Sequence, residues 1–257
     1  MKTKITKRKQ RPEKRLRKIL KKHSGRDASG QISMRHQGGR QKRYYRLIDF
    51  KRDKKDIEAK VLRIEYDPNR TVDIALIQYT DGEKRYILQP EGLKVGDTVS
   101  AGEKVEIKIG NAMKLRSVPL GTSIHNIEFY PNQGGKLIRS AGGYAVITAK
   151  DDRYAQLKFP SKEIRKISLD CYATIGQLGN IKHKLEKIGK AGRKRLMGIR
   201  PTVRGVAQNP RSHPHGGGEG KSGEGMPPKT PWGKSARGTR TREKRKWSNK
   251  LIIKRRK

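Results

Sequence analysis

The uneven distribution of charge is the feature of this sequence that most restricts how the chain can fold. Residues 1–55 carry a net charge of +18, residues 56–188 carry +4, and residues 189–257 carry +18 again. Segments with many like charges and few large apolar groups cannot bury a core, because the charges repel one another when the chain compacts. The sequence therefore predicts a nearly neutral folded middle between two basic extensions that become ordered against a polyanion.

The total charge indicates what that polyanion is. The chain has 64 Lys and Arg but only 24 Asp and Glu, a net charge of +40. Nucleic acid is the strongest candidate, because each phosphate contact releases counterions and adds affinity. The single cysteine, Cys171, excludes an internal disulfide and a zinc site built from cysteines, and it fits a reducing compartment. No run approaches the ~18 apolar residues of a membrane span, so we expect no membrane partner.

The middle of the chain has the pattern of short strands. Runs rich in Ile, Val, Leu and Tyr lie at residues 57–66, 72–80 and 83–89, and Asp81-Gly82 between the last two is a strong hairpin signal. Strict alternation over residues 104–109 indicates a further strand. That makes about five short strands between residues 56 and 110, the number of a small barrel. A second set of runs follows at residues 124–129, 136–139, 144–149, 154–158 and 163–168.

Helical periodicity does not occur in this middle, so the sequence predicts an all-β fold of two small barrels with a seam near residues 111–122. Residues 47–50 are expected to form the strand by which the chain enters the first barrel. Outside the barrels we expect one short basic helix at residues 13–20 and otherwise irregular structure.

The first basic segment has the composition of an RNA-binding surface. Cations recur every few residues, glycines allow close approach of the backbone, and Tyr44 and Tyr45 offer rings that stack on unpaired bases. For these tyrosines a position at the barrel edge, without base contact, is the alternative. The predicted RNA contacts of this segment are Arg26, Arg35, His36, Gly38, Gly39, Arg40, Lys42, Arg43, Tyr44, Arg46, Lys51 and Arg52.

The second basic segment, residues 189–205, is dense in cations, punctuated by glycine and poor in apolar groups. It predicts a clamp for RNA phosphates formed by Lys190, Arg193, Lys194, Arg195, Arg200 and Arg204. Nearer the C-terminus, Trp232 is an exposed aromatic residue in a turn, and the basic run that includes Arg240 and Arg242 adds further phosphate contacts.

Residues 209–223 contain three patterns that suggest enzymes. Residues 218–223 match a dinucleotide-binding motif, but no strand precedes them and Pro227-Pro228 forbids the helix that should follow. A P-loop would need glycine where His215 stands. His213 and His215 lack the further ligands or partners of a metal or catalytic site, with only Glu219 near. The preferred interpretation is a loop laid against RNA, with contacts from Asn209, His213, His215, Gly216 and Gly217.

No catalytic residue, resident metal or cofactor is therefore predicted, and Mg²⁺ shared with the RNA is the one ion that we expect. Eight stretches of the sequence, in this order, resemble the uL2 family of large-subunit ribosomal proteins in its bacterial form, L2. They are residues 25–52, 65–70, 81–87, 92–97, 173–176, 189–195, 198–205 and 213–220. The chain departs from the family pattern at Arg40, Gln41 and Gln208.

The resemblance implies four segments. A basic N-terminal rRNA-binding extension (1–55) precedes an OB-fold barrel (56–118) and an SH3-like barrel (119–188), and a basic, glycine-rich C-terminal extension (189–257) is embedded in rRNA. It also implies a structural, primary rRNA-binding protein near the peptidyl transferase centre, not an enzyme. Such a protein supports subunit association, tRNA binding and peptide-bond formation.

The partners implied are large-subunit rRNA, other ribosomal proteins and, through an intersubunit bridge, the small subunit; no homo-oligomer is expected. The implied location is the cytoplasmic ribosome. Because residues 1–22 are basic, a mitochondrial or plastid ribosome is the alternative, although this segment is rich in Lys and lacks the Ser of a transit peptide.

Two other functional classes compete with this interpretation. An enzyme-like factor would use His213 and His215 with Glu219, and would lose a chemical step rather than assembly when His215 is replaced by Ala. A basic regulatory or membrane-surface protein would depend on the helix expected at residues 13–20, and would bind vesicles as well as it binds rRNA.

Overall fold

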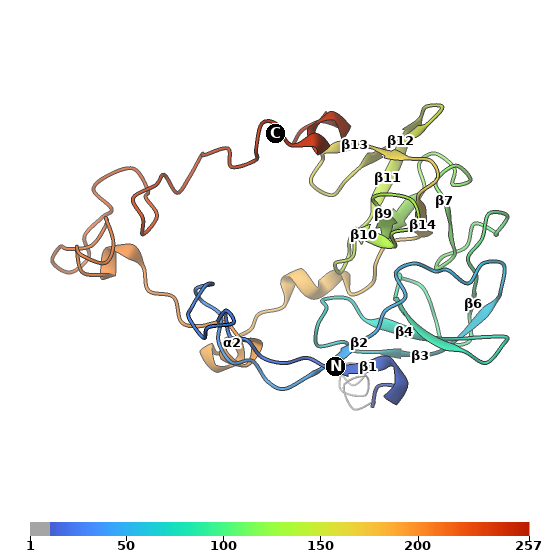
Figure 1. The fold of residues 1–257 in the computed structure, drawn as a ribbon, viewed down its shortest axis with the longest axis horizontal. Helices are drawn as coiled ribbons and strands as arrows, with labels where there is room; N and C mark the ends of the chain where they lie inside the picture. Colours follow the sequence, from blue (N-terminus) through green and yellow to red (C-terminus); the bar gives the residue numbers. More distant parts are fainter. Residues whose placement is uncertain (1–10, 257) are drawn as a thin grey trace. The chain divides into compact units, whose positions relative to one another are not determined.

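The computed structural model describes residues 11–256, and the chain divides into two compact units. The first, which we call the β unit, consists of the chain up to Leu20, Arg43–Glu186 and the residues from Ser248 on. The second, the basic unit, consists of Lys21–Lys42 and Lys187–Trp247. Every strand that the structure describes belongs to the β unit, whereas the basic unit is mostly irregular chain with one short helix, α2 (Ala191–Met197; Figure 1).

A four-stranded antiparallel sheet forms the first half of the β unit. Its strands, in the order β5-β4-β3-β6, are β5 (Lys84–Leu88), β4 (Ile74–Tyr79), β3 (Ala59–Glu65) and β6 (Thr98–Val99). Its core includes Val61, Ala75, Ile77, Ile87 and Val99, and burial of these apolar groups is a main stabilising contribution. The three runs predicted between residues 57 and 89 are thus confirmed, as is the hairpin at Asp81-Gly82, where Gln78 pairs with Lys84.

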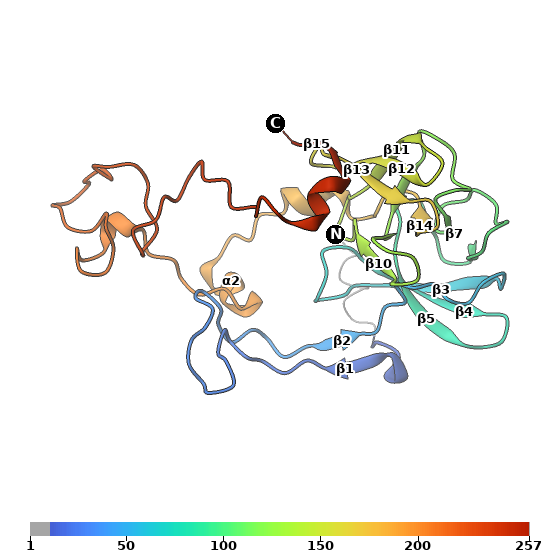
Figure 2. The ribbon, with the colours of Figure 1, turned by 45° about the horizontal axis from the view of Figure 1, so that its top comes forward.

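A seven-stranded antiparallel sheet forms the second half of the β unit (Figure 2). In the order β15-β13-β12-β11-β8-β14-β7, its strands are β15 (Ile252–Lys254), β13 (Ile164–Ser168), β12 (Tyr154–Lys158), β11 (Ala145–Lys150), β8 (Ser123–His125), β14 (Tyr172–Ile175) and β7 (Ala112–Lys114). Its fully buried side chains include Leu115, Ile124, Ile147, Leu157 and Cys171. Two short pairs complete the unit, β1 (Arg17–Ile19) with β2 (Tyr44–Arg46) and β9 (Ile127–Glu128) with β10 (Gly135–Leu137).

The helical elements of residues 11–256 are short. Besides α2 they are 3-10 turns, η1 (Lys14–Leu16), η2 (Ile181–Leu185), η3 (Gly205–Ala207) and η4 (Trp247–Leu251). None of the described helices has the length and apolar character that crossing a membrane requires. The architecture confirms the predicted fold class, which is all-β with an OB-fold barrel, an SH3-like barrel and long basic irregular extensions.

Three strands of the second sheet are not predicted by the sequence, namely β7, β14 and β15. The chain after residue 251 returns to pair with β13, with Arg165 opposite Ile252, although the sequence predicts an irregular extension throughout residues 189–257. β7 lies before residue 119, yet it pairs with β14 in the seven-stranded sheet. The predicted domain limits stay predictions.

Residues 104–109 do not form the predicted strand. The side chain of Asn111 holds them as a loop, because it accepts a hydrogen bond from the Ser100 amide (2.9 Å) and donates one to the Glu106 carbonyl (2.9 Å). Ile107 and Ile109 are exposed. Alternation of apolar residues is therefore not sufficient for a strand where a side chain supplies the local hydrogen bonds instead of a neighbouring strand.

Residues 13–20 do not form the predicted helix. After the single turn η1 the chain extends as β1 and pairs with β2. The Glu13 amide donates to the Tyr86 hydroxyl (2.9 Å), and Leu16 packs against the cluster that contains Tyr86. Since a helix of about eight residues is marginal in water, pairing and burial outweigh its local propensity.

The predicted entry strand at residues 47–50 contacts the first sheet at a single bridge. The preceding strand, β2, pairs with β1 and not with the four-stranded sheet, and within residues 47–50 only Ile48 makes a bridge, to Tyr86 of β5. The Asp49 carboxylate ends the extended segment, because it accepts the amides of Lys51 (3.1 Å) and Arg52 (2.7 Å) and so turns the chain. The predicted entry strand at residues 47–50 is thus replaced by a turn.

A buried histidine makes the β unit sensitive to acid. His125 on β8 is 1% exposed, and its Nδ1 lies 2.8 Å from the Gly176 carbonyl, which it reaches as a donor. Burial lowers the pKa of His125 to about 4; the hydrogen bond to Gly176 opposes this shift and Arg52 reinforces it. The ring is therefore neutral in the folded protein at neutral pH.

The free energy of unfolding is expected to fall by about 3 kcal/mol as the pH drops from 6.5 to 4. In this pH range His125 binds a proton in the unfolded chain but stays neutral in the folded chain. His125→Asn, whose amide can donate to the same carbonyl, is expected to remove this part of the pH dependence. Urea unfolding at a series of pH values measures both proteins, and parallel curves would show that His125 is not the cause.

Candidate nucleic-acid interface

The basic unit presents its charge to solvent. It holds 23 Lys and Arg against 4 Asp and Glu, a net charge of +19, and each of these cations except Arg40 is exposed. Four carboxylates neutralise only a small part of this charge. In the β unit, by contrast, cations and carboxylates are interleaved: Arg85 pairs with Asp49, Asp53 and Glu83. The basic unit therefore has the higher density of exposed, unneutralised positive charge, which makes it the main candidate for contact with a polyanion.

The structure brings the two predicted basic segments together within the basic unit. The Gly38 amide donates to the Gly198 carbonyl (2.7 Å), and the Arg200 amide donates to the His36 carbonyl (3.0 Å). A side chain at Gly38 would place its Cβ 3.2 Å from Cγ of Arg200, so glycine permits this close approach. Cations that lie far apart in the sequence thus share one backbone frame.

A short helix that the sequence does not predict orders part of the second segment. α2 carries Arg193, Lys194 and Arg195, all exposed. It ends in a Schellman motif, in which the Gly198 amide donates to the Arg195 carbonyl (2.9 Å) and the Ile199 amide to the Lys194 carbonyl (3.0 Å). Gly198 takes the left-handed φ of +93° that this motif needs. The segment predicted to bind phosphates thus has a fixed backbone at the end of α2.

The only carboxylate of Lys21–Lys42 shapes a loop. Asp27 Oδ1 accepts hydrogen bonds from the Ser29 hydroxyl (2.7 Å), the Ser29 amide and the Gln31 amide (3.0 Å each). The hydrogen bond from the Ser29 hydroxyl is the main cause that lowers the pKa of Asp27, so the group stays ionised. Arg26 donates to the Gly30 carbonyl (2.6 Å) across the same loop. Asp27 is therefore engaged in turn formation.

The histidines at 213 and 215 are buried within their loop. They are 8% and 7% exposed, and their rings stack with centroids 5.2 Å apart. His215 Nε2 accepts the Lys229 amide (2.8 Å), which assigns the proton to Nδ1, and Nδ1 then donates to the Glu224 carbonyl (3.1 Å). His213 Nδ1 accepts the His215 amide (3.1 Å).

These contacts favour a structural role for both rings. Both ring nitrogens of His215 are engaged by backbone groups, and the Gly205 backbone packs so tightly on His213 that a Cβ there would lie 2.5 Å from the ring. Within residues 11–256 no group of three or more His, Cys, Asp or Glu side chains is arranged to hold a metal ion. The loop at 209–217 is therefore fixed by its histidines.

Replacing His215 with Ala is expected to speed hydrogen exchange of the Lys229 amide by about 10–100-fold, because removal of the ring leaves that amide without its acceptor. Exchange of the strands in the β unit should not change. His23→Ala, an exposed histidine of the same unit, is the control. Unchanged protection of the Lys229 amide in His215→Ala would contradict the structural role.

Two of the predicted RNA contacts in the β unit are buried. Arg52 is 3% exposed and donates to the carbonyls of Gly110 and Ser100 (3.2 Å each). Arg46 is 8% exposed and lies 3.7 Å from the buried carboxylate of Asp67. Both guanidinium groups are thus engaged inside the β unit, and the predicted contacts of Arg46 and Arg52 with RNA stay predictions. Lys51 is exposed.

The neighbouring predicted residues lie at the edge of the β unit. Arg43 donates to the Pro68 carbonyl (2.7 Å). Tyr44 and Tyr45 both belong to the edge pair β1–β2: the Arg17 guanidinium lies 4.6 Å from the ring centroid of Tyr44, and that of Arg70 lies 5.4 Å from the ring of Tyr45. This placement agrees with the alternative of barrel-edge tyrosines, with Tyr44 still partly open to a base.

The remaining predicted contacts belong to the basic unit. The Arg35 guanidinium lies 5.1 Å from the ring centroid of Trp232, which is 69% exposed, so the structure joins these two residues. Arg40 donates to the Lys21 carbonyl (3.1 Å). Exposed positions are also occupied by Gly39, Lys42, Lys190, Arg204, Asn209, Gly217, Arg240 and Arg242. Their contacts with RNA stay predictions.

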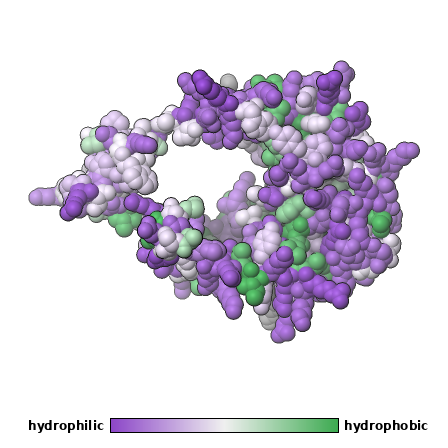
Figure 3. All heavy atoms as spheres, viewed as in Figure 1, coloured by the Kyte–Doolittle hydropathy of each residue, from purple (hydrophilic) through white to green (hydrophobic). Residues whose placement is uncertain are grey.

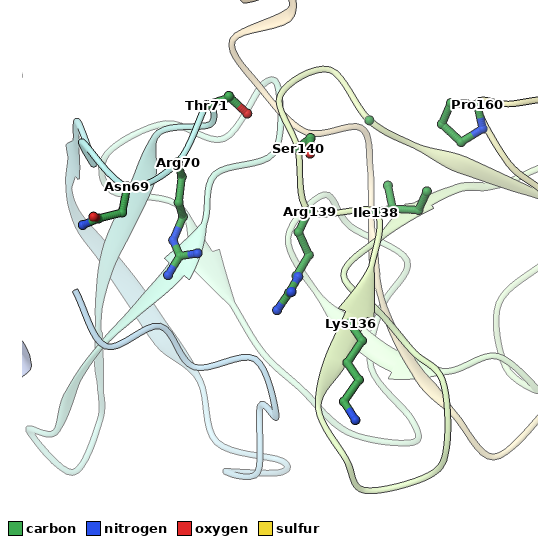
Figure 4. A pocket seen from close by; sticks show the side chains of 9 residues that line it. Asn69, Arg70, Thr71, Lys136, Ile138, Arg139, Ser140 and Pro160 are labelled. Atoms are coloured by element: carbon green, nitrogen blue, oxygen red, sulfur yellow. The ribbon is translucent and has the colours of Figure 1, made fainter. Parts of the chain in front are cut away.

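The β unit also contains a cationic pocket that the sequence does not predict. Its volume is about 570 Å³, and it is lined by Asn69, Arg70, Thr71, Lys136, Ile138, Arg139, Ser140, Gly143 and Pro160 (Figure 4). The guanidinium groups of Arg70 and Arg139 lie 5.3 and 4.7 Å from the ring centroid of Phe50. Oδ2 of Asp67 lies 3.1 Å from Nε of Arg70 and forms an ion pair with it. The pocket thus combines fixed cations, hydroxyl groups and some apolar surface.

Barrel domains joined to an exposed, cationic, glycine-punctuated unit define a protein that binds RNA as part of a ribonucleoprotein. Comparison with known families agrees. The RNA-binding N-terminal domain of ribosomal proteins L2 matches residues 13–101, and the C-terminal domain of ribosomal proteins L2 matches residues 108–233. The chain therefore belongs to the ribosomal protein L2 family. It is a structural constituent of the ribosome that binds rRNA and not a classical enzyme.

Proposed function

We propose that this chain is a primary rRNA-binding protein near the peptidyl transferase centre, where it supports subunit association, tRNA binding and peptide-bond formation that the RNA itself catalyses. The observation that carries the proposal is the basic unit, with its net charge of +19 on a frame fixed by backbone hydrogen bonds. Such a frame lowers the entropy lost on binding. The engaged rings of His213 and His215 support a loop that shapes RNA rather than one that transfers protons.

The cationic pocket is proposed as a second contact with rRNA. Arg70 and Arg139 supply planar guanidinium groups that match a phosphate bidentately, and Thr71 and Ser140 supply hydroxyl donors. Its volume and partly apolar lining also suit an unstacked nucleotide. Phosphate contacts of this kind fix the position of a protein on RNA.

The further partners are proposed from family membership. They are other ribosomal proteins of the large subunit and, through an intersubunit bridge, the small subunit. Mg²⁺ at this interface would be held chiefly by rRNA phosphates. The proposed compartment is the cytoplasm, with a mitochondrial or plastid ribosome as the alternative; residues 1–10, on which that alternative partly depends, lie outside the described residues.

Reconstitution of large subunits with and without the chain tests the proposal. Without it we expect poor assembly, weak joining to small subunits and little peptide-bond formation. The discriminating variant is His215→Ala: assembly is expected to suffer, while subunits that do assemble form peptide bonds at a near-normal rate. Normal assembly with a lost chemical step would instead support an enzyme-like role and refute the proposal.

A further inference from the structure

Four apolar side chains lie exposed in the most basic part of the basic unit. Leu196, Met197, Ile199 and Val203 are 58%, 55%, 44% and 59% exposed. They belong to residues 187–218, which contain eight Lys and Arg and no Asp or Glu. In Figure 3, hydrophobic atoms occur as separate patches on a largely hydrophilic surface. Exposed apolar groups that gather on a surface mark a site that a partner covers. These four side chains lie within residues 196–203, and we call them the apolar ridge.

The local structure explains why the chain leaves the ridge uncovered. In a Schellman motif the residue after the glycine usually packs on an apolar residue three to four positions before the helix end. Here that residue is Ile199, and the positions it would pack on hold Lys194 and Arg193. The backbone is nevertheless fixed, because the Gln41 amide donates to the Leu196 carbonyl (2.9 Å) and Ile199 bridges Gln37. The ridge is thus both preformed and open.

We propose that the apolar ridge docks on rRNA and packs against base faces exposed in a non-helical region. The inference rests on the proposed rRNA binding and adds a contact that charge alone does not provide. The cations of the same segment favour RNA over a protein, because protein interfaces are depleted of charge, and of Lys in particular, at their centres. RNA offers phosphates to the cations and unstacked bases to the apolar groups.

Contacts between cations and phosphates and contacts between apolar groups and bases differ in how their contribution to affinity depends on salt. A cation that contacts a phosphate contributes to the slope of affinity against salt concentration, because it releases counterions, whereas an apolar contact releases none. The ridge should therefore add affinity that is nearly independent of salt. Phosphate contacts position a protein without reading the RNA, so the ridge would also limit which rRNA regions the basic unit accepts.

Binding of the full-length chain to large-subunit rRNA over a range of salt concentrations tests this inference. Leu196→Ala and Met197→Ala are each expected to weaken binding about tenfold at every salt concentration, from the loss of a buried side chain, with an unchanged slope. Alanine favours helix, so α2 should persist, which circular dichroism can check. Arg195→Ala is expected to lower the slope by about 0.9. Ile107→Ala, equally exposed but in the β unit, is the control and should bind like the wild type.

Three results would overturn the inference. If Leu196→Ala and Met197→Ala bind rRNA as the wild type does while Arg195→Ala changes the slope, the ridge does not dock on rRNA although the proposed function stands. If these variants keep their rRNA affinity and instead release another ribosomal protein from reconstituted subunits, the occupant is a protein. If the wild type itself shows no salt-dependent rRNA binding, the proposed function fails together with the inference.

Discussion

Raising the monovalent salt concentration from about 50 to about 200 mM is expected to weaken binding of this chain to naked large-subunit rRNA by roughly 10³–10⁵-fold, the loss typical of 6–10 phosphate contacts. The reason is the basic unit, whose 23 cations face only 4 carboxylates. Filter binding or fluorescence titration at several salt concentrations measures the slope. A double variant that carries both Arg193→Gln and Lys194→Gln should lower the magnitude of that slope by about 2.

A shallow slope would be inconsistent with this account. If binding changes less than about tenfold over the same range, fewer than about two phosphates are contacted, and the exposed cations of the basic unit would then not form the main interface. If the double variant keeps the full slope, the phosphates are contacted elsewhere on the chain. Either result would move the interface away from α2 and the segment paired with it.

The second large effect is expected at the pocket of the β unit. Replacing Arg139 and Lys136 together by Gln should weaken rRNA binding by about 10²–10⁴-fold, because each charge-assisted hydrogen bond to a phosphate contributes roughly 1.5–3 kcal/mol. Both side chains are exposed, so their removal should lower the stability of the β unit only by about 1 kcal/mol, from the lost contact of Arg139 with Phe50. Arg70 is left in place, because it neutralises the buried Asp67. Titration with rRNA and thermal unfolding measure the two quantities.

The control for the pocket variant removes the same charge elsewhere. Arg153→Gln with Lys104→Gln alters two exposed cations of the β unit that do not line the pocket. This pair should cost much less affinity. Arg139→Lys is informative as well, because lysine keeps the charge but loses the planar fork that binds a phosphate bidentately. If the pocket pair and the control pair weaken binding equally, the pocket contributes only its general charge.

Strands with strong local signals could be predicted from the sequence. β12 occupies residues 154–158 as predicted, and β4 and β5 meet at the predicted turn at Asp81-Gly82. Here alternating or continuous apolar residues and a specific turn act within a few positions. The first sheet therefore follows largely from neighbouring residues, apart from the short strand β6 and the loop at 104–109.

Elements that depend on distant partners could not be predicted. β15 is a three-residue strand in a basic tail, and it exists because β13 offers a free edge some 90 positions earlier in the chain. β14 is only four residues long and is held by pairing on both sides, with β7 and β8. The expected helix at residues 13–20 fails for the same reason, since Tyr86 and β2 supply contacts that no local rule contains.

In the candidate site, too, features that depend on neighbouring residues could be predicted and features that depend on distant residues could not. Charge is a local property, so the exposed cations of α2 and of the paired glycine segment could be predicted from the sequence. Burial is not local: Arg52 looks like its basic neighbours, yet it is 3% exposed and donates to Gly110, 58 positions away. The pocket could not be predicted from the sequence, because Arg70 and Arg139 lie far apart within the nearly neutral middle. The only sequence signal was that Arg70 lies in a stretch that resembles the L2 family.

Chemical footprinting of large-subunit rRNA, with and without the full-length chain, tests most directly whether the basic unit is built into the RNA. We expect protection of discrete nucleotides around the peptidyl transferase centre. A variant with Arg193, Lys194, Arg195 and Arg200 replaced by Gln should lose part of that set and retain the nucleotides that contact the β unit. Protection that is uniform along the RNA, or the same in the variant and the wild type, would contradict the account.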